Sequence, residues 1–435
     1  MSEILSYSNN TTKNGEEDWI AHAPYSDDDI ARIKDPDGGL SENPRTAIPS
    51  PLAQLDLVKN AFKQLANEHL RGARMNERLD KKIVLSGIRP TGQLHLGNYL
   101  GALSNFVKMQ NEGKYDSYYF IADLHALTTN PDPKELHTNV RHILAEYLAA
   151  GLDPEKSTIF VQSDVPEVSE MYLLLNMHVG IGELMRTAAF KDKARKALGI
   201  TAPTQGDDDE DVAKEIIGAS TNKRVNAGLL TYPTLMAVDI LIQRADFVPV
   251  GKDQEQHLEL TRRFARRFNS FYKTEYFKEP QNFNFGSAPV KVPGLDGSGK
   301  MGKSEGNCIY LVDDEKTIRK KVMRAVTDAG PTEPNQPMAE PVQNLFTILK
   351  LVGTPDKVEF FTDAYNNCSI RYGDLKKEIA EDIVAMTTPI RERILDIEND
   401  DAYLHRVLEM GAERARARAG KTLADVREIM GITKF

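Results

Sequence analysis

The stretch Lys81–Gln110, "KKIVLSGIRPTGQLHLGNYLGALSNFVKMQ", decides the predicted fold. It opens with a short apolar run typical of a buried strand, and the Gly- and Pro-containing turn "RPTGQ" follows. Leu100, Leu103 and Phe106 then recur at helical spacing. Further strands in "YDSYYFIADLHAL" and "STIFVQSD" flank a helix predicted from about Lys134 to Leu148. Strands that alternate with helices predict an α/β fold with a doubly wound parallel sheet.

The chain is long enough for two or three domains, since 435 residues exceed one typical domain. Residues 1–80 are polar and predict a partly disordered N-terminal extension with one amphipathic helix from Pro51 to about Arg74. Residues 81–310 are predicted to form a Rossmann-like catalytic domain with a helical insertion at about 167–245. Residues 311–435 carry helical patterns throughout, so an all-helical C-terminal domain is expected.

The composition excludes several classes of protein. A net charge of −9 excludes a globally basic nucleic-acid binder, although a local basic surface remains compatible with it. Cys308 and Cys368 are the only cysteines, too few for a disulfide framework or for a zinc or iron–sulfur site held by cysteines. No apolar run reaches the roughly 20 residues that span a bilayer, and the polar start lacks the features of signal and transit peptides. A cytoplasmic protein without a membrane segment is therefore expected.

The motif "HLGN", His95 to Asn98, lies where the first strand gives way to a helix. Gly97 would let the main chain approach a nucleotide closely, and His95 and Asn98 offer donors beside a helix N-terminus, where partial positive charge collects. A nucleotide is expected there, in the first crevice of the parallel sheet. The alternative is a glycine-stabilised turn with a capping asparagine.

The stretch "GSGKMGKS", Gly297–Ser304, fits the phosphate-loop pattern G-x-x-x-x-G-K-[ST]. A phosphate loop must lie between a buried strand and a helix, but Pro289 and Pro293 interrupt the segment before it. The segment after it, Cys308–Val312, alternates like a strand. The sequence therefore argues against a phosphate loop, and a flexible glycine loop with two solvated lysines is one alternative.

Together, these motifs resemble the signatures of a known family. "HLGN" followed by "YLGAL" resembles the first signature of class I aminoacyl-tRNA synthetases in their tryptophanyl form, and "KMGKS", Lys300–Ser304, resembles the second. They lie about two hundred residues apart, in the order that the class requires. "GLLTYPTLMAVDILI" and "VPVGKDQEQHLELTRRFARRFN" also resemble bacterial tryptophanyl-tRNA synthetases. The resemblance covers Lys82–Asn269, resumes at the lysine loop, weakens through the C-terminal helices and leaves residues 1–80 uncovered.

The resemblance implies an activity. L-tryptophan would react with ATP to give tryptophanyl-adenylate and pyrophosphate, and tryptophan would then pass to the 2′-hydroxyl of the terminal adenosine of tRNA(Trp). Mg²⁺ would be held mainly by the ATP phosphates, with no metal site of the protein's own. A homodimer is implied, with residues 311–435 binding tRNA.

The resemblance also implies a set of site residues, carried over position by position. The catalytic residues would be His95, Asn98, Lys300 and Lys303. The ATP-binding residues would be Arg89, Thr91, Gly97, Asn98, Lys193, Gly251, Asp253, Lys300, Met301, Lys303 and Ser304. The tryptophan-binding residues would be Leu85, Tyr232, Met236, Asp239 and Gln254.

The indole-binding residues also make sense from helix geometry. Pro233 suits a first helical turn, and Tyr232, Met236 and Asp239 then lie along one face of that helix. A thioether can pack on an indole ring, and a carboxylate can accept its N–H. The alternative is a core methionine and a capping or paired aspartate.

Two features depart from the family's pattern. Gly302 stands in the lysine loop where serine is usual, which makes the loop more flexible. The acidic insert at about 197–225, with "QGDDDEDVAKE", is longer than bacterial relatives carry and is predicted to be a solvated loop. It puts the local path of Lys193 in doubt.

Three rival interpretations remain. A tyrosyl-tRNA synthetase shares the fold and signatures, although "GNYLGA" and "YPTLMAVDI" fit the tryptophan form better. A repurposed synthetase paralogue with an RNA-binding or regulatory role would not need intact His95, Asn98, Lys300 and Lys303. A small-molecule nucleotidyltransferase would not need the helical C-terminal domain.

Overall fold

The computed structural model describes residues 10–11, 17–18, 81–198, 225–251, 254–283, 285 and 290–432. The chain divides into two compact units, Met1–Arg74 and Met75–Phe435. In the first unit, β1 (Asn10–Thr11) pairs antiparallel with β2 (Glu17–Asp18). The helix predicted from Pro51 to Arg74 and the acidic run of the insert lie outside the described residues.

The second unit is built on a five-stranded parallel sheet. Its strands run in the order β5–β4–β3–β6–β7, with β3 in the middle. The chain winds from β3 outward to β5 and then returns to the other side of β3, so the winding direction reverses between β3 and β6. This confirms the predicted doubly wound α/β fold. The strands are β3 (Lys82–Ile88), β4 (Tyr115–Ile121), β5 (Thr158–Val161), β6 (Phe247–Val248) and β7 (Gln281–Asn282).

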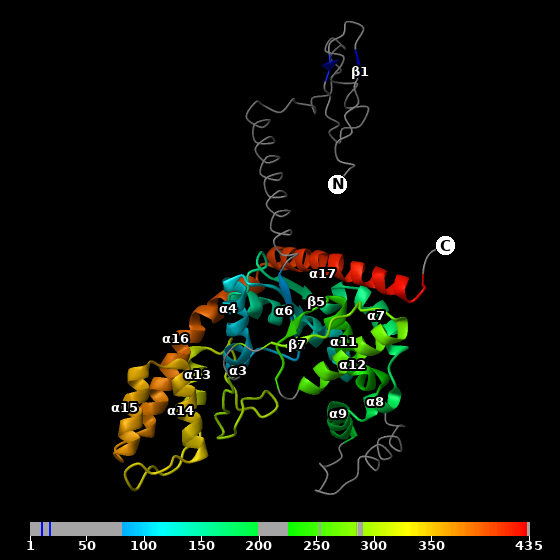
Figure 1. Cartoon of the computed structure of the whole chain (residues 1–435). Coiled ribbons are helices and arrows are strands. Elements are labelled where there is room, and N and C mark those ends of the chain that lie inside the picture. The colour runs from blue at the N-terminus through cyan, green and yellow to red at the C-terminus, as the bar shows by residue number, and fades with distance from the viewer. Residues whose placement is uncertain are drawn as a thin grey trace. The chain divides into compact units, whose positions relative to one another are not determined.

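Helices connect and cover these strands (Figure 1). In the sheet region they are α3 (Leu96–Asn98), the π-helical turn η1 (Tyr99–Leu103), α4 (Ser104–Glu112), α5 (Asp123–Ala126), α6 (Pro133–Ala149), α7 (Glu167–Asn176), α8 (Ile181–Met185), α9 (Ala188–Leu198), α11 (Ala227–Ile242) and α12 (Glu255–Tyr272). Two 3₁₀ turns, η2 (Leu127–Thr129) and η3 (Gln162–Asp164), follow α5 and β5. The later helices are α13 (Glu315–Met323), α14 (Glu340–Val352), α15 (Pro355–Asn366), α16 (Tyr372–Glu398) and α17 (Asp401–Ile429).

The two faces of the sheet bury separate apolar clusters, because successive strand side chains point to opposite faces. Leu85 of β3 lies in a cluster with residues of α7, α11 and α12. Its neighbour Val84 lies in the other cluster, with residues of α4, α6 and α16. The sheet is thus covered on both sides, as a parallel sheet requires.

Helix α17 crosses the edge of the sheet (Figure 1, red). It packs against the edge strand β5 and against α7. Leu404 and Val407 join the cluster on one face, whereas Ala415 and Leu423 join the cluster on the other. At the crossing, a Cβ atom on Gly411 would lie only 1.7 Å from the main-chain oxygen of Ile159, so the helix and the strand touch backbone to backbone.

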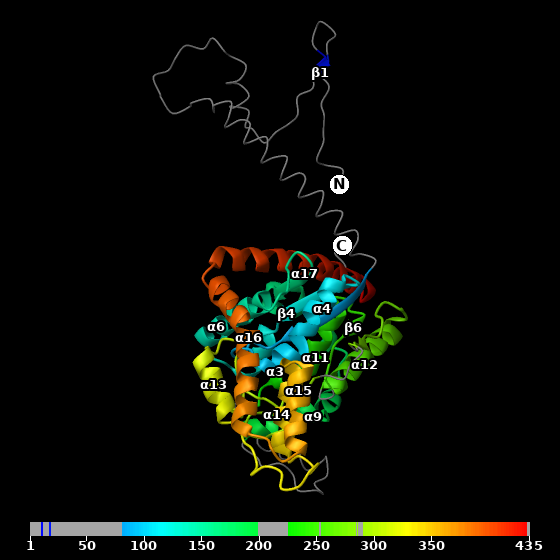
Figure 2. The same cartoon turned by 90° about the vertical axis from the view of Figure 1, so that its left-hand side faces the viewer.

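Helices α13 to α16 (Figure 2, yellow and orange) contribute to a third apolar cluster. This cluster also contains Leu96 of the "HLGN" motif and Met301 of the lysine loop. The two signature segments therefore share one core with the C-terminal helices. The domain boundary at about residue 310 stays a prediction.

Two local predictions were wrong. Pro233 does not begin its helix: α11 starts at Ala227, where the Asn226 side chain accepts a hydrogen bond from the main-chain N–H of Leu229. That cap sets the start, and the apolar, largely buried helix continues through the proline. The strand predicted at Cys308–Val312 is reduced to a single bridge between Tyr310 and His95, because residues 311 and 312 already turn away toward α13.

Candidate active site

The predicted site residues gather where the winding direction of the sheet reverses, outside the carboxyl ends of β3, β4, β5 and β6. In open α/β sheets this is where ligands bind. The "HLGN" motif follows β3, α5 follows β4 and η3 follows β5. Helix α11 brings a fourth group of side chains to the same place, through contacts with α5's neighbour η2 and with α7.

His95 and Asn98 cap each other in the turn after β3, which we call the signature turn (His95–Asn98). The Asn98 side chain accepts a hydrogen bond from the main-chain N–H of His95, at 3.1 Å. His95 Nδ1 in turn accepts from the main-chain N–H of Asn98, at 3.3 Å. This reciprocal cap starts the helix at Leu96. The capping role considered as the alternative is therefore real, and it fixes both side chains in place.

The His95 ring is uncharged at neutral pH. Burial, together with the positive charges of Lys303 and Lys300, lowers the pKa of His95 to about 4. Because Nδ1 accepts a hydrogen bond, the neutral ring carries its proton on Nε2, which can donate to a ligand oxygen. The charges of Lys303 and Lys300 are thus close enough to the signature turn to lower the pKa of His95.

The lysine loop, Gly297–Ser304, has no helix after it before α13 begins at Glu315. This rules out the phosphate-loop interpretation. Asn307 organises the loop instead: its side chain donates to Asp296 Oδ1 at 2.9 Å and accepts from the Gly302 N–H at 2.9 Å. A Cβ on Gly302 would meet only Glu305 Cγ, at 3.4 Å, so the family's usual serine would fit there.

Lys303 joins the lysine loop to the signature region directly. Its Nζ donates to the main-chain oxygen of Gly92 at 2.8 Å and to that of Thr91 at 3.4 Å. Lys300 and Ser304 are exposed on the same loop, as is Thr91 opposite it. The structure thus brings the two lysines that were predicted to be catalytic near the turn that holds His95 and Asn98.

A buried carboxylate on α11 meets the side chains that follow β4 and β5. Asp239 of α11 is 5% exposed. Its carboxylate accepts from Gln162 Nε2 at 2.7 Å and lies 3.0 Å from His125 Nε2. Burial raises the pKa of Asp239, whereas the contacts with His125 and Gln162 oppose that shift. The aromatic ring of Tyr232 lies against the His125 ring, with 4.4 Å between their centroids.

The sequence did not single out His125 or Gln162. A signal was present, because each follows a strand of the sheet at its carboxyl end, in "IADLHAL" and "FVQSD". Met236, one turn before Asp239, is half-buried, and Leu85 lies buried in the strand β3 below. Leu85 and Met236 belong to the same apolar cluster, so apolar side chains surround the fixed Asp239 carboxylate.

Two cations lie near Tyr232. Lys193 of α9 lies over the Tyr232 ring, with its Nζ 3.4 Å from the ring centroid. Burial and the nearby charge of Arg89 lower the pKa of Lys193 to about 8. Arg89 Nη1 is buried and has no hydrogen-bond partner among the described residues. An arrangement of this kind is suited to an anion such as a carboxylate or a phosphate.

The chain is similar to known proteins. Residues 77–388 match the model of the family described as tRNA synthetases class I (W and Y). A tryptophan–tRNA ligase of Porphyromonas gingivalis is 60% identical over 348 residues, which cover 80% of this chain and 98% of that relative. One from Rickettsia bellii is 41% identical over 355 residues, covering 81% of this chain and 99% of the relative.

The chain belongs to the bacterial-type tryptophanyl-tRNA synthetases of class I. A solved structure agrees: tryptophanyl-tRNA synthetase from Campylobacter jejuni, complexed with ADP and tryptophan, matches with a TM-score of 0.67 at 32% identity, over 80% of this chain and 99% of that one. A tyrosyl-tRNA synthetase of Archaeoglobus fulgidus matches at 19% identity, which shows a shared fold alone. As a class I synthetase, this chain uses ATP.

Three predicted residues of the synthetase remain to be located. Gly251 is exposed after β6, and its main-chain oxygen accepts from the N–H of Gln254 at 2.9 Å, just before α12. Asp253 lies outside the described residues. The Met301 side chain is buried in the cluster of the C-terminal helices, and its N–H donates to Val292. Met301 thus has a packing role, and its contact with ATP stays a prediction.

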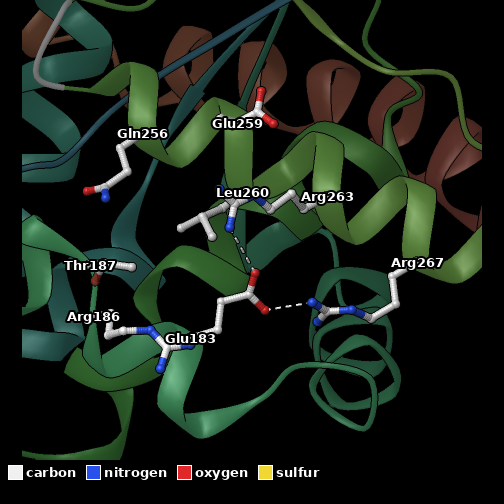
Figure 3. Close-up of a pocket in the computed structure, with 8 residues that line it drawn as sticks. All are labelled: Glu183, Arg186, Thr187, Gln256, Glu259, Leu260, Arg263 and Arg267. Atoms are coloured by element: carbon white, nitrogen blue, oxygen red, sulfur yellow. Dashed lines mark hydrogen bonds and ion pairs between the residues drawn. The ribbon is translucent and has the colours of Figure 1, made fainter.

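A separate hollow of about 320 Å³ lies between α8 and α12 of the synthetase (Figure 3). Glu183 stands at its centre and pairs with Arg267 at 2.8 Å and Arg263 at 3.6 Å. Gln256, on its rim, accepts from the main-chain N–H of Ala188 at 3.1 Å. Because α9 begins at Ala188, this hydrogen bond ties the start of the helix that carries Lys193 to α12. Its lining is Glu183, Arg186, Thr187, Gln256, Glu259, Leu260, Arg263 and Arg267.

Two searches of the described residues gave negative findings. No group of three or more His, Cys, Asp or Glu side chains there could hold a metal ion. None of the helices described is both long enough and apolar enough to span a membrane.

Proposed function

We propose that this synthetase is a tryptophan–tRNA ligase. It activates L-tryptophan with ATP to give tryptophanyl-adenylate and pyrophosphate, and it then transfers tryptophan to the 2′-hydroxyl of the terminal adenosine of tRNA(Trp). The observation that carries the proposal is the buried Asp239 carboxylate, which His125 and Gln162 hold beside Tyr232. The 60% identity to a tryptophan–tRNA ligase supports the same conclusion.

Asp239 is suited to the recognition of an indole ring. A carboxylate can accept about four hydrogen bonds, so the contacts with His125 and Gln162 leave capacity for the indole N–H. A side chain without that N–H would leave the buried acceptor short of a partner, at a cost of roughly 1–3 kcal/mol. Phenylalanine is therefore rejected. Leu85, Tyr232, Met236 and Gln254 complete the proposed tryptophan site.

The activation step needs no protein nucleophile. The tryptophan carboxylate attacks the α-phosphorus of ATP in line, and the bond from that phosphorus to the leaving pyrophosphate oxygen breaks. Catalysis then rests on positioning and on stabilising charge. The Nε2–H of neutral His95, the Asn98 turn and the ammonium groups of Lys300 and Lys303 are placed to do this. Lys303 would exchange the main-chain oxygens of Thr91 and Gly92 for phosphate oxygens.

The other ATP contacts follow from the same arrangement. Gly97 lets the main chain approach the nucleotide, while Arg89 and Lys193 provide positive charge beside the tryptophan pocket. Gly251 and Asp253 are proposed to lie near the ribose, and Thr91, Met301 and Ser304 near the phosphates. Mg²⁺ would come bound to the ATP phosphates and reduce their charge. We place the reaction in the cytoplasm, with its tRNA.

We further propose that the synthetase is a homodimer. Leu173 of α7, Met177 directly after that helix, Ile181 of α8 and Phe271 of α12 are all more than half exposed, although they are apolar. The ring of His178, which follows Met177 in the chain, lies 5.2 Å from that of Phe271. Exposed apolar patches of this kind mark interaction surfaces. Because the chain resembles dimeric relatives, we propose that a second copy of the chain binds this patch.

A charge placed in this patch is expected to separate the subunits. Phe271→Glu would bury two carboxylates against apolar side chains in a symmetric interface, so sedimentation at micromolar concentration should give a monomer in place of a dimer. Phe360→Glu, at an equally exposed phenylalanine on α15, is the control and should leave the dimer intact. A Phe271→Glu protein that sediments like the wild type would contradict this interface.

The transfer step predicts which hydroxyl receives tryptophan. A tRNA(Trp) transcript that ends in 3′-deoxyadenosine should be charged, whereas one that ends in 2′-deoxyadenosine should not, because the 2′-oxygen is the nucleophile. Acid-gel or radiolabel assays of the two transcripts, with unmodified tRNA as the control, make the comparison. Charging of the 2′-deoxy transcript alone would contradict the proposal that the 2′-hydroxyl accepts tryptophan.

A further inference from the structure

Glu146 of α6 is a carboxylic acid with no exposed surface. A buried carboxyl group needs partners, because it has lost its hydration. Its two oxygens lie 2.9 and 3.0 Å from the main-chain nitrogen of Leu94, which donates to them. Leu94 directly precedes His95. Glu146 therefore holds the main chain at the point where it enters the signature turn.

The same short segment is held from its other side. The main-chain N–H of Leu96 donates to the oxygen of Ile309 at 2.8 Å, and the N–H of Leu311 donates to the oxygen of Leu94 at 3.0 Å. The segment that carries His95 is thus clamped between α6 and the chain that follows the lysine loop. A change in the Glu146 carboxyl group acts on His95 through this clamp.

Glu146 also acts on Lys303 by charge. Burial lowers the pKa of Lys303, and the attraction to Glu146 opposes that shift. The same attraction lowers the pKa of Glu146. Glu398 of α16, which pairs with His142 of α6, opposes ionisation of Glu146. The adjacent Tyr147 is a buried phenol that stays neutral. Burial is the largest influence, and together these groups place the pKa of Glu146 at about 8.

We propose that Glu146 is a positioning residue for the activation of tryptophan: its carboxyl group holds the main chain before His95 and, when ionised, also holds the Lys303 ammonium at the Gly92 oxygen, in competition with ATP. This inference rests on the proposed function, since it concerns the lysine that serves the ATP phosphates. It assigns a role to a residue that is part of neither the predicted ATP site nor the tryptophan site.

The proposal fixes the sign of a pH dependence. The ATP phosphates are negative and draw Lys303 toward themselves, so ATP favours the neutral form of Glu146. By linkage, ATP binding takes up a proton, and ATP binds more weakly as the pH rises through the pKa of Glu146. Below that pKa, Glu146 is neutral and Lys303 is available to ATP. Above it, the carboxylate retains Lys303.

The test measures the KM for ATP in tryptophan-dependent pyrophosphate exchange between pH 6.5 and pH 9.5. For a group with a pKa of about 8, the neutral fraction falls roughly tenfold between pH 7 and pH 9, so the KM of the wild type should rise by up to about tenfold. Glu146→Gln copies the neutral form and should keep the low value throughout. Lys193 also has a pKa of about 8, so Lys193→Arg, which stays charged, is compared and should retain the rise.

Two results would overturn the role of Glu146. One is a rise in KM that persists in Glu146→Gln and disappears in Lys193→Arg, which would make Lys193 its source. The other is a Glu146→Gln protein with a lower kcat at every pH and an unchanged rise in KM, which would reduce Glu146 to packing. Exchange that fails in the wild type would instead contradict the proposed function.

A second measurement does not depend on the folding of the Glu146 variant. In the Lys193→Arg protein, ATP binding at pH 8 is followed by calorimetry in two buffers of different ionisation enthalpy. The expected result is an uptake of about half a proton per ATP, since about half of Glu146 is ionised at that pH. Binding without proton uptake would refute the competition between Glu146 and ATP for Lys303.

Discussion

Replacement of Lys303 by alanine should slow the formation of tryptophanyl-adenylate by roughly 100- to 1000-fold, the usual effect of removing one donor that stabilises charge in a transition state. The Nζ of Lys303 lies 2.8 Å from the Gly92 oxygen, beside the turn that holds His95. Its charge is thus at the proposed phosphate site, whereas Asp239 pairs with His125 and Gln162. Tryptophan affinity should therefore change by less than about twofold.

Single-turnover adenylate formation and equilibrium tryptophan binding measure the two quantities separately. Lys316→Ala is the matched control, because it removes one positive charge from an exposed position on α13, outside the lysine loop. It should leave both quantities unchanged. Equal losses in adenylate formation and tryptophan binding in Lys303→Ala would contradict the role assigned to the loop.

Replacement of Gly411 by alanine should destabilise the fold by at least about 3 kcal/mol, at the upper end of the effects of overpacking. The added Cβ atom would lie 1.7 Å from the Ile159 oxygen, and main-chain atoms of an edge strand cannot rotate away as a flexible side chain can. Helix α17 would have to lift from β5, and it would expose Ala415 and Leu423.

Gly420→Ala provides the control on the same helix. A Cβ there would meet only Glu167 Oε1, at 3.9 Å, so alanine should fit and should stabilise the helix by up to about 1 kcal/mol. Urea denaturation of the three proteins compares their free energies of unfolding. A Gly411→Ala protein as stable as the wild type would show that α17 does not pack on β5 as described.

The sequence predicted the fold because its strongest signals are local. The apolar strand of Lys82–Ile88 and the "HLGN" turn after it can both be recognised from periodicity and turn chemistry. The prediction that Tyr232, Met236 and Asp239 lie along one helix face rests on helical spacing alone. It therefore did not depend on the helix start, which was wrongly assigned to Pro233.

The features that the sequence did not predict depend on contacts between distant segments. Glu146 accepts a hydrogen bond from Leu94, which lies 52 residues away in the sequence. No pattern in the sequence of helix α6 indicates that Glu146 is buried and hydrogen-bonded. In the sequence, Gly411 predicts only a lower helix stability, because glycine is a poor helix former. In the structure, the absence of a side chain there lets α17 approach Ile159. His125 and Gln162 each follow a strand, but only the pairing of β4 with β5 places them side by side at Asp239.

The most direct test of the account is pyrophosphate exchange into ATP without tRNA, in the presence of tryptophan, of tyrosine or of no amino acid. Asp239 and its partners, together with the signature turn and the lysine loop, predict exchange that requires tryptophan and is absent with tyrosine. Exchange driven by tyrosine, or no exchange with either amino acid, would contradict the assignment of this site to tryptophan activation.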